Sequence, residues 1–261
     1  MINNDSDMTG NGVHLPLITV VTVVYNDVKH IEETILSVIN QTYPNIEYII
    51  VDGGSTDGTV DIIKKYSDSI AYWVSEPDKG IYDAMNKGIC KATGEWINFM
   101  NSGDVFHSSN VIIEIVVSDV FDTKVGVIYG DTFLYKDRKF IKKFLNKPFW
   151  STPIPYRTGK GICHQSMFTR TKLAQKLLFN LKYRISADFD MTYRIYKLGY
   201  LFIYMPITVC NFDITGMSSS RLYWKATYLE TGRILNCRFN LGYWLFFVLK
   251  YIKEYLKFVF K

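Results

Sequence analysis

The sequence predicts an α/β fold in which helices cover both faces of an open, mainly parallel sheet. Over residues 16–105, short apolar runs rich in β-branched residues alternate with segments whose apolar residues recur at helical spacing. Each apolar run ends in small or polar residues, as expected where a strand turns toward a helix. The 261 residues are 48% hydrophobic, which is enough for one sizeable core and argues against global disorder.

Four strands are expected in this part of the chain. Residues 17–24, LITVVTVV, form a continuous apolar run typical of a parallel strand buried on both faces. Further strands are predicted at residues 46–52, 70–77 and 95–100. The loops after the four strands begin at Tyr25, Asp52, Glu76 and Asn101. Because ligands of such sheets bind at the carboxyl ends of the strands, we expect these polar loops to form one binding edge.

The segments between these strands have the apolar spacing of amphipathic helices. Their apolar positions are Ile31, Ile35 and Val38, then Val60, Ile63 and Tyr66, then Ile81, Met85 and Ile89. The repeated order of strand, helix and strand favours crossover connections within a parallel sheet.

The second half of the chain is less regular. Strands are predicted at residues 125–135, 163–170 and 200–206, and a helix at 171–177. Residues 138–161 are basic, aromatic and interrupted by proline, and we expect them to form a connection.

A further helix is expected between Ser186, as the N-cap, and Gly199, as the stop signal. Its apolar face is predicted to carry Met191, Ile195 and Leu198.

The composition argues against several classes of protein. The four cysteines form no CxxC pair, which argues against a disulfide framework or a zinc knuckle and fits a reducing cytosol. The net charge is +5, but residues 220–261 alone carry +6, unlike the evenly basic surface of a nucleic-acid binder. Residues 1–15 lack the features of a signal peptide and are expected to form a flexible tail.

Three ordered blocks carry a family resemblance: PLITVVTVVYN, IIVDGGSTDGT and SEPDKGIYDAMNKGICKATGEWINFMNSGD. Together they resemble the family 2 glycosyltransferases, and the later blocks GICHQSMFTR and SADFDMTYRIYKLG look like those of a bacterial branch. The resemblance implies a GT-A fold, with a Rossmann-like nucleotide-binding sheet, over residues 16–215. Residues 16–105 would form the nucleotide-sugar half and residues 106–215 the acceptor half.

The resemblance also implies a nucleotide-sugar donor, inversion at the anomeric carbon and a divalent cation, Mn²⁺ or Mg²⁺. Such cations prefer oxygen ligands and assist the departure of a diphosphate. Asp104 is the expected metal ligand, in an Asn-Ser-Gly-Asp block where many relatives carry several acids. The donor diphosphate would complete the coordination, and Asn101 would contact the ribose or metal-bound water. The alternative is that Asp104 is an ordinary turn aspartate.

Four further residues are expected to bind the donor. Asp52 resembles the aspartate that reads the nucleobase, although Gly53 replaces a second acid of the family pattern. Tyr25 is expected to stack on the base, and Asp78 and Lys79 are placed for the base and the diphosphate. The alternatives are a loop-capping role for Asp52, a core position for Tyr25 and a solvated charged turn for the last two.

Asp188 and Asp190 are the candidates for the general base that takes a proton from the acceptor hydroxyl. Ala187 replaces the first acid of the family block, so that Asp188 aligns with the base. Asp190 is the reserve and is also placed to pair with Arg194, four residues later. The alternative is that both acids simply favour a helix N-terminus.

His164 and Gln165 form a polar dipeptide that is expected on the acceptor side or beside the metal. The alternative is an ordinary core histidine. His30 and His107 are interpreted as incidental.

Residues 216–261 are expected to form a helical tail that associates with a membrane. In the last twenty residues, lysines fall on one helical face and aliphatic residues on another. The lysines are Lys250, Lys253, Lys257 and Lys261, and the aliphatic residues are Leu249, Ile252, Leu256 and Val259. The longest charge-free stretch is about half of the roughly 20 residues that span a bilayer, so the helix would lie on the surface. The alternative is a helix packed on the sheet.

The resemblance, together with the basic tail, implies a cytoplasmic enzyme that is peripheral on the inner face of the bacterial cytoplasmic membrane, where members of the family often act on polyprenyl-diphosphate-linked sugars. It would transfer a sugar, with a UDP-sugar as first choice, to a polyprenyl-diphosphate-linked saccharide of an O-antigen, capsule or exopolysaccharide. Two other functions remain open. A sugar nucleotidyltransferase would need a Gly-rich basic loop where VYNDVKH stands, and a degenerate nucleotide-sugar-binding or scaffold protein is compatible with Ala187.

Overall fold

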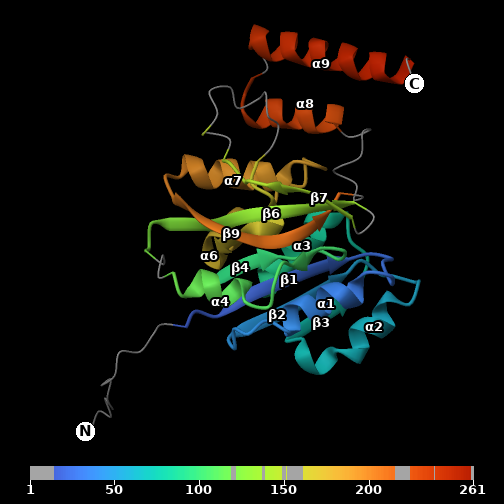
Figure 1. The fold of residues 1–261 in the computed structure, drawn as a ribbon, viewed down its shortest axis with the longest axis vertical. Helices are drawn as coiled ribbons and strands as arrows, with labels where there is room; N and C mark the ends of the chain where they lie inside the picture. Colours follow the sequence, from blue (N-terminus) through green and yellow to red (C-terminus); the bar gives the residue numbers. More distant parts are fainter. Residues whose placement is uncertain are drawn as a thin grey trace.

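The protein is described by a computed structural model over residues 15–118, 122–136, 139–148, 151, 161–214, 224–237 and 239–259. Within these residues a mixed sheet lies between two layers of helices, and the predicted α/β class is confirmed (Figure 1). Apart from Leu15, the predicted N-terminal tail lies outside the described residues.

The first half of the sheet is parallel. In spatial order its strands are β3 (Tyr72–Ser75), β2 (Ile46–Asp52), β1 (Ile18–Val24) and β4 (Trp96–Phe99). The pairs β2–β3, β1–β2 and β1–β4 are all parallel. Because parallel strands end at the same edge of a sheet, the loops that follow these four strands gather there.

The second half of the sheet mixes strand directions. β8 (Met167–Arg170) is antiparallel to both β4 and β6 (Val125–Lys136), whereas β9 (Leu201–Asp213) is parallel to β6. β5 (Val105–Phe106) pairs with β9, and β7 (Lys139–Phe144) pairs with β6, both antiparallel. The end of β9 therefore comes close to the turn that follows β4.

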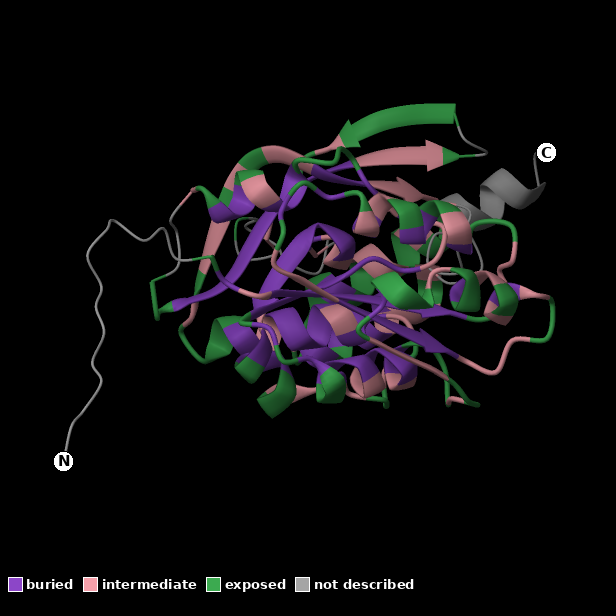
Figure 2. Ribbon diagram, turned by 90° about the horizontal axis from the view of Figure 1, so that it is seen from below, coloured by how far each residue is buried: buried purple, intermediate pink, exposed green. Residues whose placement is uncertain are grey.

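Two apolar clusters cover the two faces of the sheet. Val20 and Ile50 belong to one cluster and Val21 and Ile49 to the other, because neighbouring strand residues point to opposite faces. The helices in the first cluster are α1 (Ile31–Ile39), α2 (Thr59–Lys65) and α4 (Val111–Val116), and those in the second are α3 (Ile81–Lys91), α6 (Thr171–Leu177) and α7 (Ala187–Lys197). Figure 2 shows the buried strands between helices with exposed outer faces.

Two further helices, α8 (Trp224–Ile234) and α9 (Leu241–Val259), lie beyond α7, on the side of the sheet away from α1 and α2 (Figure 1). Tyr228 and Tyr243 join them: each hydroxyl donates to the carbonyl oxygen of the other residue at 2.8 Å. Gly232 lies directly against the Tyr243 ring, where a side chain would collide with it. Among the described residues, no helix combines the length and the apolar character that crossing a bilayer requires.

The structure moves several predicted boundaries. The predicted strand at 163–170 is a 3₁₀ turn, η3 (His164–Ser166), followed by β8, and the strand predicted at 200–206 continues to Asp213. β7 lies in a segment predicted to be a connection. It is exposed and rich in lysine, so it shows no apolar alternation, and its pairing with β6 places it in the sheet.

One expectation for α7 is wrong, whereas the N-cap position of Ser186 is confirmed, as is the stop at Gly199 by its left-handed φ of 81°. Ser186 occupies the N-cap position, but its hydroxyl makes no capping hydrogen bond and has no partner. Leu198 is not on the buried face with Met191 and Ile195; it lies at the C-cap, where the chain turns away, and is 52% exposed.

Candidate functional site

A cavity of about 470 Å³ opens at the edge of the sheet where the parallel strands end. The loops after β1 and β4, the turn η3, the start of α7 and the end of β9 all line it. The predicted site residues that reach it are Asn101, Asp104, His164, Gln165 and Asp188. The fold therefore brings residues of both predicted halves to one cavity.

Asp104 lies in the turn between β4 and β5, and its side chain is almost fully enclosed. The Gln165 amide donates to its Oδ2 at 2.7 Å, and the Asp213 backbone N–H donates to its Oδ1 at 3.2 Å. Burial raises the pKa of Asp104 to about 8, against the lowering effect of the Gln165 hydrogen bond. The charged carboxylate is thus disfavoured unless a cation comes beside it.

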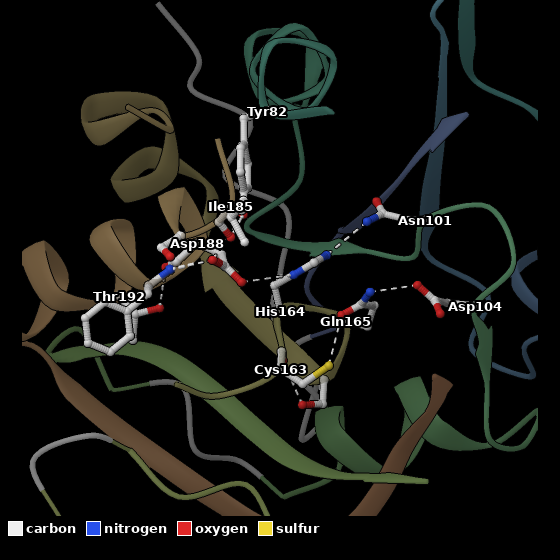
Figure 3. A network of polar contacts seen from close by, with 12 residues as sticks. Tyr82, Asn101, Asp104, Cys163, His164, Gln165, Ile185, Asp188 and Thr192 are labelled. Atoms are coloured by element: carbon white, nitrogen blue, oxygen red, sulfur yellow. Dashed lines mark hydrogen bonds and ion pairs between the residues drawn. The ribbon is translucent and has the colours of Figure 1, made fainter. Parts of the chain in front are cut away.

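His164 connects the β4 turn to α7 (Figure 3). Asn101 Nδ2 lies 2.9 Å from His164 Nε2, and His164 Nδ1 lies 3.4 Å from Asp188 Oδ2. If the amide donates to Nε2, the ring proton of neutral His164 is on Nδ1 and faces the Asp188 carboxylate. Burial lowers the pKa of His164, but the hydrogen bond and charge of Asp188 outweigh this effect and raise it. The histidine is therefore held between the two halves of the site.

Asp188 lies in the first turn of α7 and lines the cavity, with its carboxylate toward His164 (Figure 3). The Tyr82 hydroxyl lies 3.1 Å from Oδ1 and 2.8 Å from the Ile185 carbonyl oxygen. The Phe189 backbone N–H also donates to Oδ1, at 2.8 Å. Three neighbours thus orient a carboxylate that is 27% exposed and keeps a free lone pair for a proton.

Asp190 has a different environment. Its Oδ2 accepts a hydrogen bond from Arg194 Nε at 2.8 Å, so the predicted ion pair is present. The remaining guanidinium nitrogens donate to the Leu177 and Leu178 carbonyl oxygens. Burial raises the pKa of Asp190, while Arg194 opposes the shift. Asp190 does not line the cavity and links α7 to the end of α6.

Tyr25 and Asp78 meet over Gly53 at the same edge of the sheet. A Cβ atom at Gly53 would lie 2.6 Å from Asp78 Oδ2 and 3.2 Å from Tyr25 Cδ2. Tyr25 is 65% exposed, so it is not a core residue. Lys79 follows in an exposed position before α3. Because Gly53 has no side chain, the Tyr25 ring and the Asp78 carboxylate can both approach its backbone. We call these three residues the Gly53 platform.

Asp52 is fully buried, and its carboxylate is occupied by its own loop. It accepts hydrogen bonds from the backbone N–H groups of Gly54 and Ser55 and from the hydroxyls of Ser55 and Ser75. Three of these bonds converge on Oδ2 and one goes to Oδ1, so one acceptor site of Oδ1 receives none of them. These contacts show that Asp52 holds the loop after β2, which was the alternative; its base-reading role stays a prediction.

The profile described as Glycosyl transferase family 2 matches residues 19–201. This chain belongs to that family. An uncharacterized glycosyltransferase of Mycobacterium tuberculosis is 32% identical over 216 residues, which cover 79% of this chain and 78% of the relative. A PGL/p-HBAD biosynthesis glycosyltransferase of Mycobacterium bovis is 26% identical over 219 residues, which cover 79% of this chain and 80% of the relative.

Solved glycosyltransferases share the fold, and the predicted GT-A class is confirmed. S. aureus TarS 1–349 in complex with UDP aligns with a TM-score of 0.60 at 19% identity, covering 75% of this chain and 60% of that one. The mannosyltransferase PcManGT from Pyrobaculum calidifontis, in complex with GDP-Man and Mn²⁺, aligns with a TM-score of 0.62 at 20% identity, covering 85% and 62%. The family 2 chain thus spans less than two thirds of either solved chain.

The structure adds cavity residues to this family 2 site that the sequence analysis did not select. Asp27 and His30 follow β1, hydrogen-bond to each other and line the cavity, a place that the sequence analysis did not expect for His30. Asp27 also accepts from the Ser102 hydroxyl at 2.6 Å. Its position just after a strand end was an available signal. Arg184 and Asp213 gave no such signal, because only the tertiary fold brings them to the cavity.

The oxygen atoms around Asp104 suit a hard divalent cation. Asn101 Oδ1 is buried without a hydrogen-bond partner, and the Asp104 carboxylate lies in the same cavity. Within the described part of the chain, however, no group of three or more His, Cys, Asp or Glu residues is arranged to hold a metal.

Proposed function

We propose that this family 2 glycosyltransferase transfers a sugar, with inversion, from a nucleoside-diphosphate sugar to a hydroxyl group of a lipid-diphosphate-linked saccharide. The observation that carries the proposal is that Asp104 and Asp188 line the same cavity. Asp104 is a buried acid whose charged form a cation would stabilise, and Asp188 is an oriented carboxylate from the other half of the fold. A UDP-sugar is the first choice of donor. TarS structures with UDP and UDP-GlcNAc support this choice, and the GDP-Man complex of PcManGT makes GDP-sugars the comparison.

The donor would extend from the Gly53 platform to Asp104. Tyr25 would stack on the nucleobase and Asp78 would accept a hydrogen bond from its edge. The diphosphate would lie at the turn after β4, where Asp104 and Asn101 Oδ1 would hold Mn²⁺ or Mg²⁺ together with phosphate oxygens. The bound cation supplies Lewis-acid stabilisation of the departing diphosphate. Lys79, next to Asp78, would add positive charge.

Asp188 would act as the general base. Its carboxylate accepts the proton of the acceptor hydroxyl while that oxygen bonds to the anomeric carbon, and the bond from this carbon to the diphosphate oxygen breaks on the opposite face. Tyr82 and the Phe189 N–H orient the carboxylate. His164 fixes its second oxygen relative to the β4 turn. Asp190 is already paired with Arg194, so it would stabilise α7 and take no part in the reaction.

The C-terminal helices would place the enzyme on the inner face of a membrane. One face of α9 exposes an apolar stripe: Leu241, Leu245, Val248, Leu249 and Ile252. Lys250, predicted on a charged face, instead has its ammonium 5.3 Å from the Trp224 ring centroid on α8. The side chains of Lys253, Lys257 and Lys261 lie outside the description. The apolar stripe would therefore carry the contact with lipid.

The first test is transfer activity with UDP-, GDP- and dTDP-sugars and a short-chain lipid-diphosphate saccharide, with Mn²⁺ or with EDTA. We expect one donor to be used, with Mn²⁺, and the product to have the opposite anomeric configuration. Asp188→Asn should lower kcat by about 100-fold or more, because a positioned general base contributes roughly 10²–10⁴. The matched variant Asp190→Asn should retain most of the turnover. Donor binding without transfer to any acceptor would instead support a binding protein.

A further inference from the structure

Glu230 of α8 makes an unusual contact with the segment that leads into α7. Its Oε1 accepts a hydrogen bond from the Arg184 backbone N–H at 2.9 Å, and its Oε2 accepts from those of Ile185 and Ser186 at 3.1 and 2.9 Å. The side chain is only 9% exposed. A single carboxylate thus holds three consecutive backbone N–H groups, which we call the α7 entry.

The α7 entry has no capping side chain of its own. Ser186 stands at the N-cap position, but its hydroxyl makes no hydrogen bond. The Glu230 carboxylate brings negative charge to the same helix N-terminus, where the helix dipole stabilises it. Hydrogen bonds that involve a charged group contribute more to stability than neutral ones. An N-cap side chain would accept from the N–H of Asp188 or Phe189. Glu230 instead fixes the backbone at and just before the N-cap, so a distant helix holds the segment from which α7 starts.

A continuous set of contacts leads from the α7 entry to the proposed base. The Ile185 N–H is bound to Glu230, and the Ile185 carbonyl oxygen lies 2.8 Å from the Tyr82 hydroxyl. The same hydroxyl lies 3.1 Å from Asp188 Oδ1. Arg184, whose N–H is also bound to Glu230, lines the cavity. Movement of the α7 entry would therefore shift the Arg184 side chain at the cavity and the Tyr82 hydroxyl that contacts the proposed base, Asp188.

We propose that Glu230 is a positioning residue that, through the α7 entry, holds Asp188 in its reactive place and Arg184 at the cavity. The inference rests on the proposed function, since it assigns Glu230 a role in the reaction for which Asp188 is the base. It also makes α8 part of the catalytic unit, beyond any contact with a membrane. Glu230 itself does not line the main cavity and touches no reacting atom.

The test uses the full-length chain with a short-chain soluble acceptor, at a temperature well below unfolding of every variant. Glu230→Ala removes all three acceptors, whereas Glu230→Gln keeps the volume and one oxygen. Tyr228→Phe is the matched control on α8, because it loses a buried hydrogen bond to Tyr243 and leaves the α7 entry intact. We measure kcat, the donor dissociation constant, and hydrogen exchange over residues 184–190.

We expect Glu230→Ala to lower kcat by about 10- to 100-fold, as displacement of a catalytic group by about 1 Å does, with unchanged donor affinity. Glu230→Gln should be intermediate, and both variants should speed exchange in the α7 entry. Tyr228→Phe should keep the wild-type kcat. Equal kcat in wild type and Glu230→Ala would overturn the positioning role of Glu230 and leave the proposed function unaffected. A wild-type protein that binds donor but transfers nothing would overturn the proposed function and, with it, this catalytic role.

Discussion

His164 is one of the residues that link the two halves of the site. Its ring touches Asn101, from the turn after β4, and Asp188, from the first turn of α7. Its partly buried ring is held by polar contacts on both nitrogens, unlike the apolar setting of an ordinary core histidine. A side chain of this kind transmits the position of one half of the site to the other.

Replacement of His164 by Ala should therefore lower kcat by about 10- to 100-fold with a smaller change in donor affinity, because Asp188 loses one of its orienting partners. Steady-state kinetics with varied donor and acceptor would measure the two effects. His107→Ala is the matched control, since His107 contacts Asn211 and Phe133 away from the cavity. A kcat that falls equally in both variants would point to a general loss of stability.

Gly53 offers a second test at the scale of one residue. In Gly53→Ala, the added methyl group would lie 2.6 Å from Asp78 Oδ2 and must displace that carboxylate or the Tyr25 ring. We expect donor affinity, measured by calorimetry with the nucleoside diphosphate, to fall about tenfold, which corresponds to 1.4 kcal/mol. Unchanged affinity would remove the Gly53 platform from the nucleotide site.

Among the elements, β2 is tied to the turn between α3 and β4 by Glu47. Its carboxylate accepts hydrogen bonds from the Thr19 and Thr93 hydroxyls and from the Thr93 and Gly94 backbone N–H groups. Burial raises the pKa of Glu47, but these hydrogen bonds outweigh it, and the pKa lies below its usual value. The contact therefore favours the charged form in the folded protein.

This depressed pKa predicts a pH-dependent contribution to stability. The contribution is present above the unfolded pKa of about 4.5 and is lost as the pH falls through the lower folded pKa. Glu47→Gln should lower the free energy of unfolding by about 1 kcal/mol at pH 7. Urea unfolding should show a smaller difference from wild type at pH 3. The exposed Glu114→Gln serves as control, and a constant difference across this range would contradict the prediction.

The stripe on α9 gives a prediction for a single helix. Leu241→Ser with Leu245→Ser removes two of its exposed leucines, which are 83% and 60% exposed and so contribute little to packing. We expect weaker co-sedimentation with anionic phospholipid vesicles and unchanged kcat on a soluble acceptor. Vesicle binding equal to that of wild type would exclude the stripe as the lipid contact.

At the scale of the whole molecule, the cavity lies where the parallel half of the sheet meets the mixed half. The turn after β4 supplies Asp104, and its two oxygens are bound by η3 and the end of β9. Neither half alone forms this enclosure. Ligand binding should therefore stabilise the complete fold, because a ligand that binds only the native state shifts unfolding by mass action.

A thermal-unfolding matrix would measure this effect. Mn²⁺ alone and nucleotide alone should raise Tm slightly, and both together should raise it by more than the sum, because substrate oxygens would complete the coordination. Asp104→Asn should abolish the joint effect and keep the effect of nucleotide alone. A full shift with Mn²⁺ alone would instead indicate a preformed metal site.

The sequence by itself determined the elements whose signals are local. The buried strands β1 and β2, the helices α1 and α3 with their apolar spacing, and the stop at Gly199 follow from side-chain periodicity and backbone preference within a few residues. The ordered motifs likewise determined the family. The i, i+4 pair of Asp190 and Arg194 is local as well, and it was predictable from spacing.

Only the tertiary structure decided which of these residues share a site. It separated Asp188, which faces the cavity, from Asp190, which does not, although both lie in the first turn of α7. It turned Asp52 inward and brought Glu230 to the α7 entry, 44 positions from Ser186 in the chain. Such contacts depend on sheet order and helix packing, which join residues distant in sequence. The apolar periodicity of one segment does not indicate which other segment it will pack against.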